Sequence, residues 1–201
     1  MSFPEMPEAP ASPSVTTVTL SDYVTQDSVT SFVDQLRSAI GQCQKNKQPW
    51  LPVYINTYGG SVYQGLAAMD FMMNSPVPII TISYGTTMSM GVPLFSCGKK
   101  RYVAPSSTLM IHGVSAGIEG KLDDMAVGLK ETRRLEELSD EITERNCGLP
   151  KGTIRKITRK KKSVDKYITA EKALKLGIAT HIGLPNFSVK VKKKLKYKMG
   201  E

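Results

Sequence analysis

The sequence has few of the residues that build disulfide frames, zinc sites or membrane spans. Only three cysteines occur in 201 residues, and they are far apart, which excludes a disulfide framework and the close spacing of a zinc ligand set. No run of about 18 apolar residues is present, so no membrane-spanning helix is expected. Residues 1–14 contain four prolines, with no basic stretch before an apolar one, which excludes a signal peptide. These absences predict a reduced compartment, the cytoplasm or an organelle interior.

Acidic side chains are scarce near the C-terminus. From Lys151 onward, sixteen lysines and arginines stand against three acids, a local charge of +13, whereas residues 1–150 carry −4. Such asymmetry can indicate contact with nucleic acid or an anionic surface. The lysines lack interleaved aromatic residues and any known binding motif. Solvated helix faces and a basic tail explain the charge more simply, so nucleic acid is not an expected partner.

Strand-like and helix-like segments alternate along residues 15–184. This alternation predicts one α/β domain whose strands are largely parallel. We expect residues 1–14 to be a disordered segment or propeptide, and residues 185–201 to be a basic C-terminal tail. The expected strands cover residues 15–20, 51–55, 77–84, 99–103, 109–112 and 178–182, and the expected helices cover 29–43, 62–73, 92–97, 121–146, 151–160 and 169–176.

Ser89 occupies the most informative stretch, between the apolar strand at 77–84 and an apolar helix at 92–97. A serine on such a strand-to-helix turn exposes its hydroxyl beside unpaired backbone N–H groups, as a nucleophile requires. A simpler interpretation is that Ser89 caps the helix. The hydrolase motif Gly-x-Ser-x-Gly is only half met, because Thr87 stands where its first glycine belongs.

Two other strand ends carry groups that suit acyl transfer. His112 closes an apolar strand before a glycine-bearing loop, and Gly59-Gly60 closes another with bare backbone N–H groups. The second histidine, His181, lies in a terminal strand and is most simply structural. A hydroxyl, an imidazole and backbone donors are therefore expected at one edge of the sheet. Spacing alone leaves four carboxylates open as a third triad member: Asp123, Asp124, Asp140 and Asp165.

Three short motifs, at residues 54–62, 88–91 and 109–112, resemble the proteolytic subunit of the Clp protease, ClpP, in order and spacing. The resemblance covers residues 15–183. It implies a crotonase-like spiral of ββα repeats with a protruding handle helix at 121–146. It also implies a serine endopeptidase that cleaves unfolded polypeptides inside two stacked heptameric rings, fed by an ATP-driven AAA+ unfoldase.

The same resemblance assigns roles to individual residues. Ser89 would be the nucleophile, His112 the general base and Asp165 the acid of the triad. The backbone N–H groups of Gly60 and Met90 would form the oxyanion hole. Neither a metal nor a cofactor is implied for this chain, since ATP would be used by the partner unfoldase.

The sequence departs from the family pattern at several positions. Tyr58 replaces the usual proline before the paired glycines, and Gly113-Val114 replaces the Gln-Pro that usually follows the histidine. The segment after His112 is therefore expected to be less fixed. Ser163-Val164 stands where a charged pair with arginine often supports ring-to-ring contact, so that contact is expected to be weaker.

Four alternative functions fit the sequence less well than a ClpP-like peptidase does. A non-proteolytic ClpP-like structural or regulatory subunit of a mixed ring would generally lose triad residues, and this chain keeps all three. A crotonase-class acyl-CoA enzyme would not need serine, histidine and aspartate together. A Ser–Lys peptidase would have lysine at the position of His112. A nucleic-acid-binding module is supported only by the basic C-terminal residues.

Overall fold

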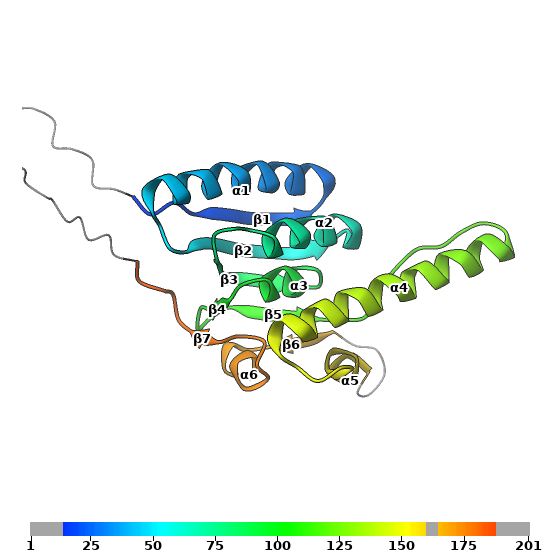
Figure 1. Ribbon diagram of the computed structural model, residues 1–201. Coiled ribbons are helices and arrows are strands. Elements are labelled where there is room, and N and C mark those ends of the chain that lie inside the picture. The colour runs from blue at the N-terminus through cyan, green and yellow to red at the C-terminus, as the bar shows by residue number, and fades with distance from the viewer. Residues whose placement is uncertain (1–13, 160–164, 188–201) are drawn as a thin grey trace, which may run out of the picture. The chain divides into compact units, whose positions relative to one another are not determined.

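The structure, a computed structural model, describes residues 14–159 and 165–187. Ser163-Val164 lies outside the described residues, as do nearly all of the expected N-terminal segment and basic tail. The fold that positions the candidate site lies within residues 16–185 (Figure 1). Its elements are, in chain order, β1 (Val18–Val24), α1 (Gln26–Asn46), β2 (Leu51–Gly60), α2 (Val62–Met73), β3 (Ile79–Met88), α3 (Gly91–Ser96), β4 (Lys100–Val103), β5 (Thr108–Ile111), α4 (Leu122–Cys147), α5 (Thr153–Arg159), β6 (Lys166–Ile168), α6 (Ala170–Lys175) and β7 (His181–Ile182).

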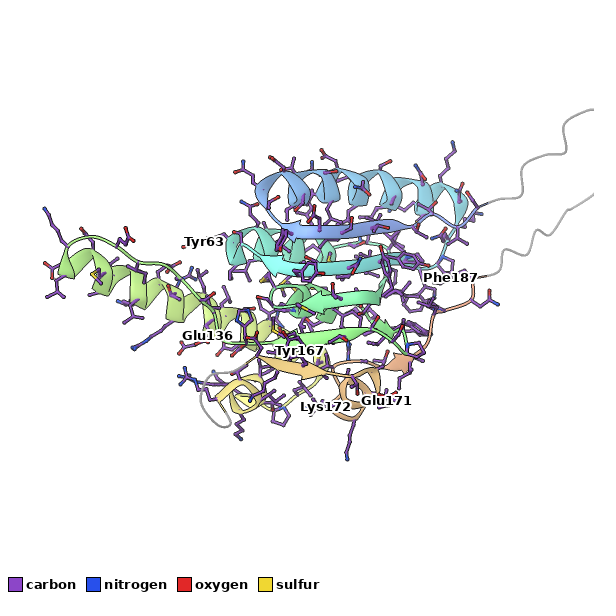
Figure 2. All side chains as sticks on the ribbon, turned by 180° about the vertical axis from the view of Figure 1, so that it is seen from behind. Tyr63, Glu136, Tyr167, Glu171, Lys172 and Phe187 are labelled. Atoms are coloured by element: carbon purple, nitrogen blue, oxygen red, sulfur yellow. The ribbon has the colours of Figure 1, made fainter. Side chains whose placement is uncertain are left out.

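The strands form a mostly parallel sheet, as the alternation of segments predicts. Its main order is β1-β2-β3-β4-β7, and each of these neighbouring pairs is parallel. Strand β5 pairs in parallel with the end of β3, and β6 pairs with β5 in the antiparallel direction. Helices α1, α2 and α3 lie in front of the sheet in Figure 1, and the strands come forward when the molecule is seen from behind in Figure 2.

Strand β3 changes its neighbour along its length, which determines where the site lies. Its first half pairs with β4, and its last residues, Thr86–Met88, pair with β5. Gly85 lies between the two halves with φ of 73°, a conformation that favours glycine. The Asn56 side chain bridges the irregularity by accepting the Thr86 N–H at 2.9 Å. Strand β3 therefore continues four residues beyond the expected end at residue 84.

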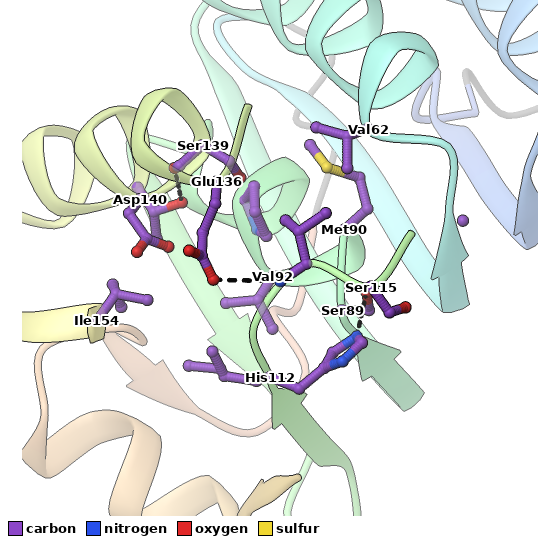
Figure 3. A pocket seen from close by; sticks show the side chains of 15 residues that line it. Val62, Ser89, Met90, Val92, His112, Ser115, Glu136, Ser139, Asp140 and Ile154 are labelled. Carbon is purple, nitrogen blue, oxygen red and sulfur yellow. Dashed lines mark hydrogen bonds between the residues drawn. The ribbon is translucent and has the colours of Figure 1, made fainter. Parts of the chain in front are cut away.

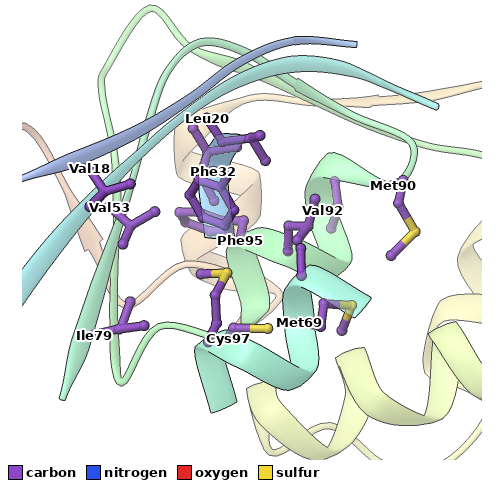
Figure 4. Close-up of a cluster of buried hydrophobic side chains, with 14 of the residues drawn as sticks. Val18, Leu20, Phe32, Val53, Met69, Ile79, Met90, Val92, Phe95 and Cys97 are labelled. Atoms are coloured by element: carbon purple, nitrogen blue, oxygen red, sulfur yellow. The ribbon is translucent and has the colours of Figure 1, made fainter. Parts of the chain in front are cut away.

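The core lies between the sheet and helices α1 to α3 (Figure 4). Phe32 of α1, Met69 of α2 and Phe95 of α3 are each 1% exposed or less, and they pack with Leu20 and Val53 of the sheet. Each such large apolar side chain contributes about 1.5–3 kcal/mol when fully buried. Helix α1 begins with a reciprocal capping box between Thr25 and Ser28, which accounts for its start at Gln26, three residues before the expected range.

Strands β1, β7 and β6 also differ from what the sequence predicts, and β2 continues to Gly60 beyond the expected end at residue 55. Strand β1 begins at Val18, the first residue paired with β2, rather than at residue 15. Strand β7 contains only two residues, whereas residues 178–182 were expected to form it. The carbonyl oxygen of Ile178, before the strand, accepts a hydrogen bond from Nε of Arg101 at 2.7 Å and so is not available for strand pairing. Strand β6 was not predicted, since three residues are too few for an alternating pattern to be visible.

Helix α4 confirms the long helix expected over residues 121–146 and ends at Gly148, which has φ of 67°. Its first half exposes the apolar side chains of Leu122, Met125, Val127 and Leu129, whereas Leu135 and Ile142 of its second half are buried. Within the described ranges, no helix is long and apolar enough to cross a membrane.

Candidate active site

The carboxyl ends of three parallel strands bring the expected groups to one edge of the sheet. Gly60 ends β2, Ser89 follows β3 and His112 follows β5. The backbone N–H of Ser89 donates to the Met110 carbonyl oxygen at 2.8 Å, which extends the β3–β5 pairing to the serine itself. The strand pairing thus places Ser89 beside His112, which lies two residues after Met110.

The Ser89 side chain engages His112 and does not cap a helix. Its Oγ lies 2.7 Å from Nε2 of His112 (Figure 3). Met90 occupies the N-cap position of α3, which has no side-chain capping bond, so the interpretation of Ser89 as a cap is wrong. Ser89 has φ of 51°, a left-handed conformation that costs a non-glycine residue about 1–2 kcal/mol. The β3–β5 pairing holds this unfavourable turn and presents the hydroxyl to the imidazole.

The paired glycines are required by the close approach of neighbouring backbone. A Cβ added at Gly59 would lie 2.6 Å from the Ser89 Cβ and 2.9 Å from the Met90 nitrogen. A Cβ added at Gly60, which has φ of 148°, would lie 2.5 Å from the Val24 carbonyl oxygen. Gly60 and Met90 line the same cavity as Ser89. The glycine backbone at the end of β2 therefore lies directly against the turn that carries Ser89.

Strand β6 brings one of the four aspartates next to His112. In the β5–β6 pairing, Ile111 is opposite Lys166, so the next step of the antiparallel register places His112 opposite Asp165. The two side chains line a common cavity. Asp165 is exposed, and no hydrogen bond between it and His112 is found among the described residues. Asp123 and Asp124 lie instead in the first turn of α4.

A family model described as Clp protease matches residues 14–185. The chain belongs to the Clp protease family. The ATP-dependent Clp protease proteolytic subunit of Deinococcus radiodurans is 36% identical over 140 residues, which cover 69% of this chain and 67% of the relative. The resemblance to ClpP, the α/β fold class and the assignment as a serine peptidase are thereby confirmed.

The Clp-family site opens into a cavity that reaches α4, and this extension was missed from the sequence. Asp140, the remaining aspartate, lines it together with Ser89 and His112. Burial raises the pKa of Asp140 to about 7, with further increases from Glu136 and Glu144 that Arg155 and Arg159 oppose. The available signal was the spacing of acids at 136, 140 and 144, which places them on one face of the helix.

Glu136 was also missed, and it holds the segment that follows His112. Its Oε1 accepts the N–H of Val114 at 3.3 Å, and its Oε2 lies 3.6 Å from Nη2 of Arg159. A proline at position 114 has no N–H to donate, so this tether depends on the departure from the family pattern. Residues 113–118 have no regular secondary structure, but Val114 is anchored to α4.

The second histidine, His181, lies outside the candidate active site of this ClpP-like chain. His181 stacks on Tyr102 with ring centroids 4.4 Å apart, and its Nδ1 lies 2.7 Å from the Thr180 hydroxyl, in keeping with a structural role. In the portion of the chain that the structure describes, no three or more His, Cys, Asp or Glu side chains form a group that could hold a metal. The expectation that this chain needs no cofactor stays a prediction.

Proposed function

We propose that this Clp-family peptidase cleaves unfolded polypeptides with a triad of Ser89, His112 and Asp165. The observation that carries the proposal is the 2.7 Å separation of Ser89 Oγ from His112 Nε2, a distance suited to proton transfer. Nε2 takes the hydroxyl proton as Oγ attacks the scissile carbonyl carbon. The triad further requires Asp165 to accept a hydrogen bond from Nδ1–H, a contact not made among the described residues, and that bond would keep the imidazole in the required tautomer.

The remaining steps use backbone groups and a water molecule. The N–H groups of Gly60 and Met90 donate to the oxyanion of the tetrahedral intermediate. The imidazolium of His112 then gives its proton to the leaving amine, and an acyl ester remains on Ser89. Water, deprotonated by the same imidazole, hydrolyses the ester and returns the proton to Oγ. No metal or cofactor takes part in these steps.

Labelling with a fluorophosphonate tests the nucleophile. We expect the wild-type chain to be labelled, Ser89→Ala to lose all labelling, and His112→Ala to reduce its rate by orders of magnitude. Ser115→Ala is the matched control, because Ser115 lines the same cavity and should leave labelling unchanged. Labelling that persists in Ser89→Ala would refute the assignment. A folded wild-type chain that is never labelled would favour the non-proteolytic subunit.

We also propose that the chain assembles into heptameric rings that stack through α4 and receive substrate from an AAA+ unfoldase or mix with a ClpP paralogue. Support comes from the exposed apolar side chains on the first half of α4, among them Leu122 and Val127, which are 82% and 69% exposed. Sedimentation should show rings, and Val127→Glu should shift them toward smaller species. A monomer at tens of micromolar would contradict the proposal.

A further inference from the structure

The cavity beside Ser89 changes character along its length (Figure 3). Near the serine its walls include the apolar side chains of Met90 and Val92, with Ile154 further along, and the polar side chains of Ser115 and Glu136 also line it. At the far end, the second half of α4 contributes the polar side chains of Ser139, Asp140 and Thr143. A side chain that enters from the scissile bond would therefore pass Met90, Val92 and the Glu136 carboxyl, which Val114 N–H and Arg159 already engage, before it meets Asp140.

Among the described residues of this region, Asp140 is the carboxylate that is left to meet a ligand. None of the ion pairs found among the described residues includes it. Its acidic neighbours on α4 each have a partner. Two of them face α5: Glu136 contacts Arg159 as well as the Val114 N–H, and Glu137 lies 3.5 Å from Arg155. Glu141 lies 2.5 Å from Lys151, and Glu144 accepts the N–H groups of Gly152 and Ile154 at 2.8 and 2.7 Å.

We propose that this cavity receives the substrate side chain on the acyl side of the scissile bond, the P1 residue, and that Asp140 selects lysine or arginine there. The inference rests on the proposed role of Ser89 as nucleophile. Lysine and arginine match the cavity because each has an apolar stem and a cationic head. The stem packs against Met90 and Val92, and the head forms a charge-assisted hydrogen bond with the carboxylate.

The surroundings of Asp140 make this selection depend on pH. Burial, Glu136 and Glu144 raise its pKa to about 7, whereas Arg155 and Arg159 from α5 act in the opposite direction. Glu137, Glu141 and Lys151 lie around it on the helical side, and His112 lines the cavity on the sheet side. The carboxyl is therefore largely neutral at pH 6 and largely ionised at pH 8. An ionised Asp140 favours a cationic P1 side chain, and a neutral one tolerates an uncharged side chain.

Two fluorogenic peptides that differ only in arginine or leucine at P1 test the selection. We expect the arginine-to-leucine ratio of kcat/KM to rise about tenfold between pH 6 and pH 8, following the ionised fraction of a group with a pKa near 7. Effects of pH on the shared catalytic groups cancel in this ratio, because both peptides are cleaved by the same site. Asp140→Asn should lower the ratio about tenfold at pH 8 and remove its pH dependence. Asp123→Asn, a change at an exposed position of the first turn of α4, should alter neither.

Binding to Ser89→Ala separates the selection from the chemistry. Fluorescein-labelled product peptides that end in arginine or leucine should differ about tenfold in affinity at pH 8 by fluorescence polarisation, and Asp140→Asn should abolish that difference. Equal affinities, or equal kcat/KM ratios in the wild-type chain and Asp140→Asn, would overturn the inference even if both peptides are cleaved. A binding preference without any hydrolysis would instead support the pocket and refute the proposed function.

Discussion

The two sides of the candidate site are built in different ways. On the sheet side, backbone pairing places the groups, as in the hydrogen bond from Ser89 N–H to the Met110 carbonyl and the close approach of Gly59 to Ser89. On the helical side, α4 and α5 meet through carboxylates and guanidinium groups, as in the contact between Glu136 and Arg159. Backbone pairing therefore allows only one placement of the groups on the sheet side. On the helical side, the placement of the side chains depends on which of them are charged.

This difference predicts two kinds of mutational effect. A change on the sheet side should remove activity almost entirely, because a displaced backbone cannot be compensated by a neighbouring side chain. A change on the helical side should give a smaller effect that varies with pH, because the groups there are titratable and partly screened by solvent.

Asp165→Asn tests whether the sheet side includes the short strand β6. We expect kcat/KM for peptide hydrolysis to fall by about 10³–10⁴, because an amide cannot hold the imidazole tautomer that takes the serine proton. Far-UV circular dichroism should remain unchanged. Tyr167→Phe is the matched control on the same strand, since its side chain is 58% exposed. Full activity in Asp165→Asn would show that another group orients His112.

Gly60→Ala tests the backbone approach between β2 and β1. The added Cβ would lie 2.5 Å from the Val24 carbonyl oxygen at φ of 148°, so we expect a loss of about 2 kcal/mol or more in unfolding free energy. Peptide hydrolysis should fall at least about 100-fold, because the donor at this position would shift. Gly41→Ala in α1 meets no atom within 4 Å and should instead stabilise the fold by about 0.5–1 kcal/mol. Equal effects of the two substitutions in chemical denaturation would contradict this account.

The same contrast explains how much of the site could be predicted from the sequence. Ser89 and His112 each follow an apolar run, and such local patterns are visible without knowledge of the fold. Asp165 could not be chosen from spacing, because its position depends on the non-local pairing of β5 with a three-residue strand. The resemblance to ClpP proposes it instead, and its role stays a prediction. In the sequence Asp140 is one of four carboxylates left open and Glu136 is not distinguished from its neighbours. Only the packing of α4 against α5 and the segment after His112 buries Asp140 and gives Glu136 its partners.

The overall fold was predictable to a similar extent. Long helices with apolar residues at regular spacing, such as α1 and α4, were placed within a few residues of their observed bounds. The division of β3 between two neighbouring strands was not predictable, because it depends on Gly85 and on the Asn56 side chain, 30 residues away from Thr86. Distant contacts of this kind leave no periodic pattern in the sequence.

Glu136 joins the two sides, so its substitution should have an intermediate effect. Glu136→Ala removes the acceptor of the Val114 N–H and should lower kcat/KM for a leucine P1 peptide by about tenfold. Glu136→Gln keeps an oxygen at that position and should restore most of the activity, although it loses the charge that faces Arg159. An equal loss in both variants would assign the effect to the ion pair and not to the tether.

Asp140→Asn should produce the smallest effect, a gain in stability that depends on pH. The pKa of this carboxyl is raised from 3.8 to about 7, so the folded chain keeps its proton where the unfolded chain has released it. The stabilisation from the neutral carboxyl is therefore complete below about pH 4 and is lost as the pH rises to about 7. Asparagine cannot ionise and avoids that loss. We expect the Tm of Asp140→Asn to match the wild-type value near pH 4, to exceed it increasingly up to pH 7, and to remain about 3 °C or more higher at pH 8.

Glu137→Gln is the control for this stability profile, because it removes a neighbouring acid whose side chain is 60% exposed and, among the described residues, is paired with Arg155 alone. Exposed ion pairs contribute little, so its Tm should stay close to the wild-type value at every pH. Differential scanning calorimetry from pH 4 to pH 8 distinguishes the outcomes. If the Tm difference for Asp140→Asn were constant or decreased with pH, the carboxyl would not be held neutral by burial in the fold. The helical side would then resemble the sheet side, with an arrangement that charge does not adjust.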